Sequence, residues 1–140
     1  MPLTVKVNVE NISDADSSNE RTATYSAGTG NPSWVTITET GTNAGNINLS
    51  NPSQADRNRT VNIEWTLPSD FSATFEEDEP IGFTAVAPAT STADFTNVTG
   101  QGTKTVTVSD SNNDATSGLN YSYTLYLSDG TRIDPKVINY

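Results

Sequence analysis

Apolar and polar residues alternate in short runs along the whole chain, and no stretch shows the 3.6-residue period of an amphipathic helix. In residues 3–9 (LTVKVNV) every second side chain is apolar, and residues 60–67 (TVNIEWTL) repeat the pattern. This period of two predicts β-strands with one buried face. Shorter or less regular runs predict eight further strands, at residues 22–26, 34–38, 46–49, 81–87, 93–98, 103–108, 120–127 and 131–138.

Segments rich in Gly, Pro, Asn, Asp and Ser separate these runs and have the composition of turns. About ten short strands at regular spacing within 140 residues predict one all-β domain, residues 1–140. The expected fold is an antiparallel β-sandwich, Ig-like in general shape, or a sheet closed on itself. The residues expected in the core are Val5, Val7, Val61, Ile63, Trp65, Val106, Val108, Leu125 and Ile133.

The last two predicted strands form a hairpin in which residues 128–130 (SDG) are a three-residue loop, with Gly130 in the left-handed conformation. The predicted opposite pairs are Leu127–Thr131, Tyr126–Arg132, Leu125–Ile133, Thr124–Asp134 and Tyr121–Val137. This register places Pro135 on the core-facing row. Because proline has no N–H to donate to a sheet, the closing strand is expected to be an edge there.

Net charge and composition restrict the partners. The chain has a net charge of −10 with only 7 basic residues, which argues against binding to nucleic acids and to anionic membrane surfaces. It contains 22 threonines and few lysines, so its sheet edges carry little charge to protect them. We therefore expect a homo-oligomer or a complex with an assembly partner, formed through residues 3–9 or 131–138 as edge strands.

The chain has no cysteine and no histidine. Disulfides, Ser-His-Asp and Cys-His catalysis and most zinc sites are thereby excluded. No cofactor is expected. The N-terminal stretch MPLTVKVNVENIS lacks the basic and apolar regions of a signal peptide, which favours a cytoplasmic or virion- and assembly-associated location.

One loop carries possible metal ligands. In residues 110–118 (DSNNDATSG), Asp110, Asn112 and Asp114 occupy alternate positions, like the opening of a calcium-binding loop. An EF-hand is rejected because Ala115 stands where that loop needs glycine. A looser calcium site and a hydrogen-bonded Asx turn both remain open.

Three lysines, Lys6, Lys104 and Lys136, fall in predicted strands. An Ig-like domain can cross-link a lysine to an Asp or Asn side chain when an acid assists. The alternative is a lysine whose stem packs on the sheet while its ammonium reaches water.

Residues 105–139 resemble the C-terminal half of the DP-EP family of small bacterial β-sandwich proteins. The shared features are a strand ending in Asp, an Asn-rich loop, an aromatic-alternating strand and a closing DPxIxN-like element. Here that element is DPKVIN, residues 134–139, with its apolar pair shifted by one. The resemblance implies self-cleavage at the Asp134–Pro135 bond by an aspartic-type mechanism. Glu79–Pro80 supplies a Glu-Pro pair.

Two functions follow from these observations. The first is a non-catalytic structural or assembly subunit, such as a surface, fibre or virion-type module, that self-associates through edge strands. The alternative is a self-cleaving, aspartic-type protein that acts on its own Asp134–Pro135 bond. In that case Asp134 activates a water molecule, and Thr124, its expected cross-strand neighbour, donates a hydrogen bond to the Asp134 carboxyl.

Overall fold

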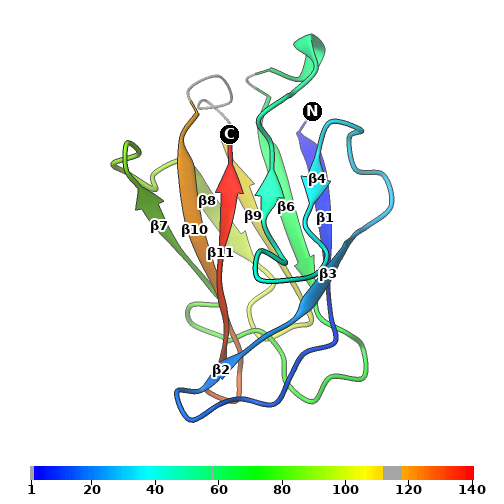
Figure 1. Cartoon of the computed structure of the whole chain (residues 1–140), viewed down its shortest axis with the longest axis vertical. Helices are drawn as coiled ribbons and strands as arrows, with labels where there is room; N and C mark the ends of the chain where they lie inside the picture. Colours follow the sequence, from blue (N-terminus) through cyan, green and yellow to red (C-terminus); the bar gives the residue numbers. More distant parts are fainter. Residues whose placement is uncertain (1, 58, 112–117) are drawn as a thin grey trace.

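The computed structural model of the 140-residue chain describes residues 2–57, 59–111 and 118–140. In these ranges eleven strands form two sheets, which lie in two layers (Figure 1). The same ranges contain no α-helix and one short 3-10 helix, η1 (Gln54–Asp56). The predicted all-β class is therefore confirmed. Neither sheet closes on itself.

The first sheet has the strand order β3–β1–β6–β9–β8. Its strands are β1 (Leu3–Glu10), β3 (Thr24–Ala27), β6 (Val61–Thr66), β8 (Phe95–Thr99) and β9 (Thr105–Asp110). Burial alternates residue by residue along β6 and β9, as expected for strands with one face on a core.

The second sheet has the strand order β4–β5–β11–β10–β7. Its strands are β4 (Thr36–Ile37), β5 (Ile47–Asn48), β7 (Ile81–Val86), β10 (Asn120–Tyr126) and β11 (Arg132–Asn139). A further strand, β2 (Glu20–Arg21), pairs with the beginning of β11. All ten predicted strands are present, and β2 is the one that alternation did not predict.

Both sheets turn one face toward a single hydrophobic core. The nine residues predicted to be buried are all at most 1% exposed, so this prediction is confirmed. In the centre of the core, Trp65 of β6 and Tyr123 of β10 meet across the two layers, with ring centroids 5.0 Å apart.

The strands are not all antiparallel. Among the strands of the described ranges, three pairs are parallel, namely β1–β6, β2–β11 and β5–β11, so both sheets are mixed. The predicted purely antiparallel arrangement is wrong in this respect. Side chains alternate between faces in parallel and antiparallel strands alike, so the hydrophobic pattern does not distinguish the two.

The predicted edge strands are also wrong. In the first sheet β1 lies between β3 and β6, and in the second β11 lies between β10 and the strands β2 and β5. Among the described residues, the outermost strands are β3 and β8 in the first sheet and β4 and β7 in the second.

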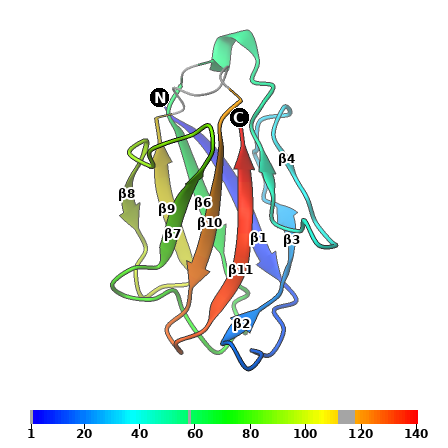
Figure 2. The same cartoon turned by 60° about the vertical axis from the view of Figure 1, so that its left-hand side comes forward.

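The two sides of the molecule where these outer strands meet are built differently. Figure 2 shows β7 and β8 on one side and β3 and β4 on the other. On the β3 side, the amide of Tyr25 donates to the carbonyl of Glu39 over 2.9 Å, so the segment after β4 covers part of β3. On the β7 side, the rings of Phe83 and Phe95 stack with centroids 4.1 Å apart, and side chains rather than backbone bonds close the gap between the layers.

Candidate functional site

The predicted cleavage bond, Asp134–Pro135, lies at an irregularity between β10 and β11. The nearest regular pairs on either side are Leu125–Ile133 and Tyr123–Lys136. Two residues of β11, Asp134 and Pro135, therefore stand opposite one residue of β10, Thr124. This arrangement is a β-bulge, in which one strand carries an extra residue.

The hairpin register is confirmed before the bulge and wrong after it. Gly130 has a φ of 84° and its amide donates to the carbonyl of Leu127, as the predicted three-residue loop requires. Beyond the bulge, Tyr121 faces Ile138 instead of the predicted Val137. The prediction assumed an uninterrupted ladder, and the extra residue at the bulge shifts it by one.

The surroundings of the bulge explain how a proline fits within β11. On the side away from β10, β2 pairs with β11 at residues 132–133 and β5 pairs at residues 138–139. Pro135 lies between these two stretches, where its missing N–H costs no strand pairing. At the end of this unpaired stretch, between the pairing with β2 and the pairing with β5, the amide of Val137 donates to the side-chain oxygen of Asn46 over 2.9 Å.

The bulge also changes which residues of β11 face the core. Ile133 is buried before it, and Lys136 and Ile138 are buried after it. Lys136 is only 8% exposed, and its stem lies beside the ring of Tyr25 and the backbone of Gly45. The predicted register had not placed Lys136 on the core-facing row, so its burial corrects that register.

Lys136 lies beside a cluster of three aromatic residues, Tyr25, Trp65 and Tyr123. The Tyr123 hydroxyl donates to the carbonyl of Gly45 over 2.6 Å. Burial raises the pKa of Tyr123 well above its usual value, the neighbouring Tyr25 raises it further, and the nearby indole of Trp65 partly opposes the rise. Tyr123 therefore stays a neutral hydrogen-bond donor that holds the core together, and it does not act as a base near neutral pH.

The two X-Pro pairs named by the family resemblance lie on opposite sides of β10. Glu79–Pro80 precedes β7, and the Pro80 carbonyl accepts a hydrogen bond from the amide of Tyr126. Asp134–Pro135 lies on β11, the other neighbour of β10. Two strand spacings separate the two backbones, about 10 Å. The two pairs are therefore not adjacent in the sheet.

Thr124 is half-buried on the outward-facing row of β10, opposite the bulge. The side chains of Asp134 and Pro135 lie outside the part of the chain that the structure describes. The hydrogen bond expected between Thr124 and the Asp134 carboxyl therefore stays a prediction.

The three possible calcium ligands are only partly described. Asp110 is 1% exposed at the end of β9, where its backbone pairs with Val61 and Phe95. Asn112 and Asp114 lie outside the described residues, so the calcium site also stays a prediction. Within residues 2–57, 59–111 and 118–140, no three Asp or Glu side chains gather as a metal site requires.

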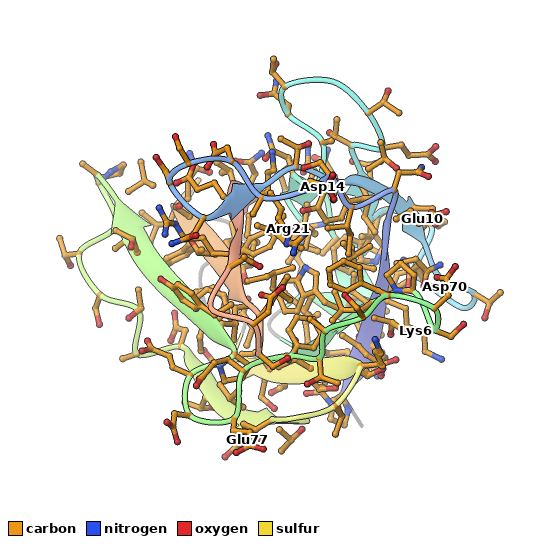
Figure 3. All side chains as sticks on the ribbon, turned by 90° about the horizontal axis from the view of Figure 1, so that it is seen from below. Lys6, Glu10, Asp14, Arg21, Asp70 and Glu77 are labelled. Carbon is orange, nitrogen blue, oxygen red and sulfur yellow. The ribbon has the colours of Figure 1, made fainter. Side chains whose placement is uncertain are left out.

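Carboxylates also meet at the end of the molecule seen in Figure 3. Glu10, at the end of β1, and Asp70, after β6, lie near each other there, and together with Pro68 they line two adjoining open hollows of about 430 and 440 Å³. Calcium takes six to eight oxygen ligands, so two carboxylates at an open surface do not define a cation site.

Arg21, near the middle of the same end in Figure 3, fastens β2 to the turn before β11. Its guanidinium donates to the Thr131 hydroxyl, the Ser13 carbonyl and the Asp129 carboxylate over 2.8–2.9 Å. Burial raises the pKa of Asp129, but hydrogen bonds from Thr131 and Arg21 outweigh it, and the net pKa is below the usual value. No sequence pattern predicted this contact, because Arg21 and Asp129 are far apart along the chain.

Lys104 has a structural role. Its ammonium donates to the carbonyls of Phe71 and Ala73 and lies over the Phe71 ring, 5.6 Å from the centroid. These contacts tie the segment before β9 to residues 71–73. The cross-link suggested for strand lysines gains no support from this position.

The outer strands β7 and β8 have no strand on their outer edges in the described part of the chain. Neither residues 81–86 nor residues 95–99 contain a charged side chain. Val86, at the end of β7, is 40% exposed and is the one large hydrophobic residue that is exposed in the described part of the chain. Sequence reasoning missed this feature because it assigned the edges to β1 and β11.

Among the residues described, no helix is long and apolar enough to span a bilayer. Neither a scan against protein-family models nor a search of curated proteins finds a match to this chain. The resemblance of residues 105–139 to the DP-EP family therefore stays a prediction.

Proposed function

We propose that this chain is a non-catalytic assembly subunit with an Ig-like sandwich fold that associates with copies of itself through its sheet edges. The observation that carries the proposal is the asymmetry of the two sides. One side is partly closed by the backbone bond from Tyr25 to Glu39, whereas on the other side β7 and β8 have no strand on their outer edges in the described residues.

The composition of these two strands supports the proposal. Soluble proteins normally protect sheet edges with charges, prolines, bulges or very short strands. Strand β7 has six residues with no charge and no proline, in a chain whose net charge is −10. No charged side chain lies within the strand itself, so its edge is available for pairing.

The Ig-like shape is supported by the packing of the two sheets. They face each other across one core, and Trp65 is completely buried against Tyr123 of the opposite sheet. A buried tryptophan between two facing sheets is a feature of Ig-like domains.

Sedimentation equilibrium over a wide concentration range tests the function. We expect the weight-average mass to rise above the 14.9 kDa of one chain as concentration increases. A mass that stays at 14.9 kDa at every concentration contradicts the proposal.

Self-cleavage at Asp134–Pro135 is the second candidate, and the bulge at this bond favours it. A bulge interrupts the ladder and leaves one residue without a ladder partner at this bond. In the proposed reaction the Asp134 carboxylate accepts a proton from the water, the hydroxide adds to the Asp134 carbonyl, and the bond to Pro135 breaks as its nitrogen takes up a proton. The product is a free Pro135–Tyr140 peptide.

A further inference from the structure

We infer that β7 binds the β7 strand of a second copy of this chain, antiparallel to it, so that the two β7-containing sheets become continuous. This inference rests on the proposed self-association and names the strand and the partner. It follows from comparing the four outer strands, from the direction of the backbone groups of β7, and from the distribution of charge around that strand.

The other outer strands are poorer templates than β7. Strand β4 has two residues, and β3 is partly covered by the segment that contains Glu39. Strand β8 is interrupted by a register shift between Thr96 and Thr99, where Asn97 has a φ of 54°. Strand β7 pairs with β10 over all six of its residues without a shift. It is therefore the outer strand with the longest regular edge.

The backbone of β7 has groups directed away from β10. In an antiparallel ladder, hydrogen-bonded pairs alternate with pairs that are not bonded. The amide of Tyr126 donates to the carbonyl of Pro80, which makes that pair a bonded one, in line with the register of β7 and β10. Counting along the strand, the amides and carbonyls of Ile81, Phe83 and Ala85 point outward from the sheet. These three residues offer a second strand a row of donors and acceptors.

The charge around β7 selects the direction of the partner and its identity. Residues 76–79 (EEDE), just before β7, are all acidic, whereas residues 81–93 carry no charge. Antiparallel pairing of two β7 strands places each acidic segment beside the uncharged end of the other copy. Parallel pairing places the two acidic segments side by side, where like charges repel. The edge is therefore complementary to itself about a two-fold axis, the commonest symmetry of oligomers.

The side chains on the outer face agree with this geometry. Thr84 and Val86 are exposed there, and the ring of Tyr126 packs over Gly82. A second β7 strand would extend this face with further Thr and Val side chains, which favour cross-strand contacts.

The test compares wild type with Ala85→Pro and Ala85→Ser by sedimentation equilibrium. Proline removes an outward amide and leaves the bonds to β10 intact, whereas serine keeps the amide and a small side chain. We expect Ala85→Ser to associate like wild type and Ala85→Pro to associate at least tenfold more weakly, with an unchanged near-ultraviolet circular dichroism spectrum. Equal association of all three proteins overturns the inference and leaves self-association standing. A monomeric wild type overturns both.

A second variant covers the case in which proline lowers the stability of the fold. Thr84→Asp changes an exposed side chain, keeps every backbone bond, and places a negative charge on each copy at the centre of the paired strands. We expect association at least tenfold weaker than that of wild type at low salt. Thr84→Ser is the uncharged control. If Thr84→Asp associates as strongly as Thr84→Ser, the result contradicts pairing through β7.

Discussion

The indole ring of Trp65 and the phenol ring of Tyr123 join the two sheets, with centroids 5.0 Å apart and planes inclined by 48°. Trp65 is fully buried, and the Tyr123 hydroxyl donates to the carbonyl of Gly45 over 2.6 Å. These two contacts of Tyr123 connect β6, β10 and the segment before β5. The core is fixed at this point by packing and by a hydrogen bond.

Replacement of Trp65 by alanine should lower the free energy of unfolding by about 3–5 kcal/mol, because it leaves a large cavity between the sheets. Urea denaturation followed by far-ultraviolet circular dichroism measures the change. Val86→Ala is the control, since Val86 is 40% exposed, and its effect should stay within about 0.5 kcal/mol. Equal losses for the two variants would show that Trp65 does not lie in the core.

Alanine at Gly45 should destabilise the fold more than alanine at Gly30. Both glycines have positive φ, 93° and 87°, so the backbone strain of alanine is similar at the two positions. A Cβ at Gly45 would lie 2.7 Å from the Tyr25 ring and 2.9 Å from Cγ of Lys136, whereas a Cβ at Gly30 meets no atom within 4 Å. We expect Gly45→Ala to cost about 1–3 kcal/mol more in urea denaturation. Equal costs would contradict the inward position of Lys136.

The stability of the protein should fall in acid, in part through Asp129. The pKa of Asp129 in the folded protein is below the usual value of 3.8, so its contribution is fully present above that value and is lost as the pH falls through the folded pKa. Asp16 and Asp56, whose pKa values are also lowered, act in the same direction. The melting temperature should therefore decrease below about pH 4.

Asp129→Asn isolates the contribution of this carboxylate. It removes the charge that pairs with Arg21 and keeps the size of the side chain. We expect the variant to melt below wild type at neutral pH and to approach wild type in acid. A melting difference that does not change with pH would exclude the ion pair as its cause.

Alternation and turn composition predicted most of the fold. Val5, Ile63 and Val108 follow strict parity, and their burial requires only that each strand has one inward face. The parallel pairing of β1 with β6 was not predictable in this way, because parity is the same in either direction. The two residues of β2 are both charged, and no hydrophobic pattern marks them as a strand.

The site was predicted less well than the fold. Pro135 did signal an irregular position in the last strand, but it does not tell whether the irregularity is an edge or a bulge. The bulge then moved Lys136 onto the core-facing row, a change that depends on the exact number of residues between two pairings. The open edge at β7 depends on the order of strands in the sheet, which local sequence does not determine.

The Asp134–Pro135 bond can be tested directly by incubating the purified protein over a series of pH values and recording its intact mass. If self-cleavage occurs, the mass should decrease slowly by that of the Pro135–Tyr140 hexapeptide. Asp134→Ala and Asp134→Asn should abolish the loss. A mass that is unchanged after days at every pH leaves the bulge as a structural device that accommodates the proline.

The most direct test of assembly through β7 is amide hydrogen exchange measured residue by residue in dilute and in concentrated solution. The amides of Phe83 and Ala85 point away from β10, and that of Thr84 points toward it. In dilute solution we expect Phe83 and Ala85 to exchange fast and Thr84 to be protected. In concentrated solution all three should be protected, since the second strand accepts the outward bonds. Fast exchange of Phe83 and Ala85 at every concentration, with Thr84 protected throughout, would contradict the account.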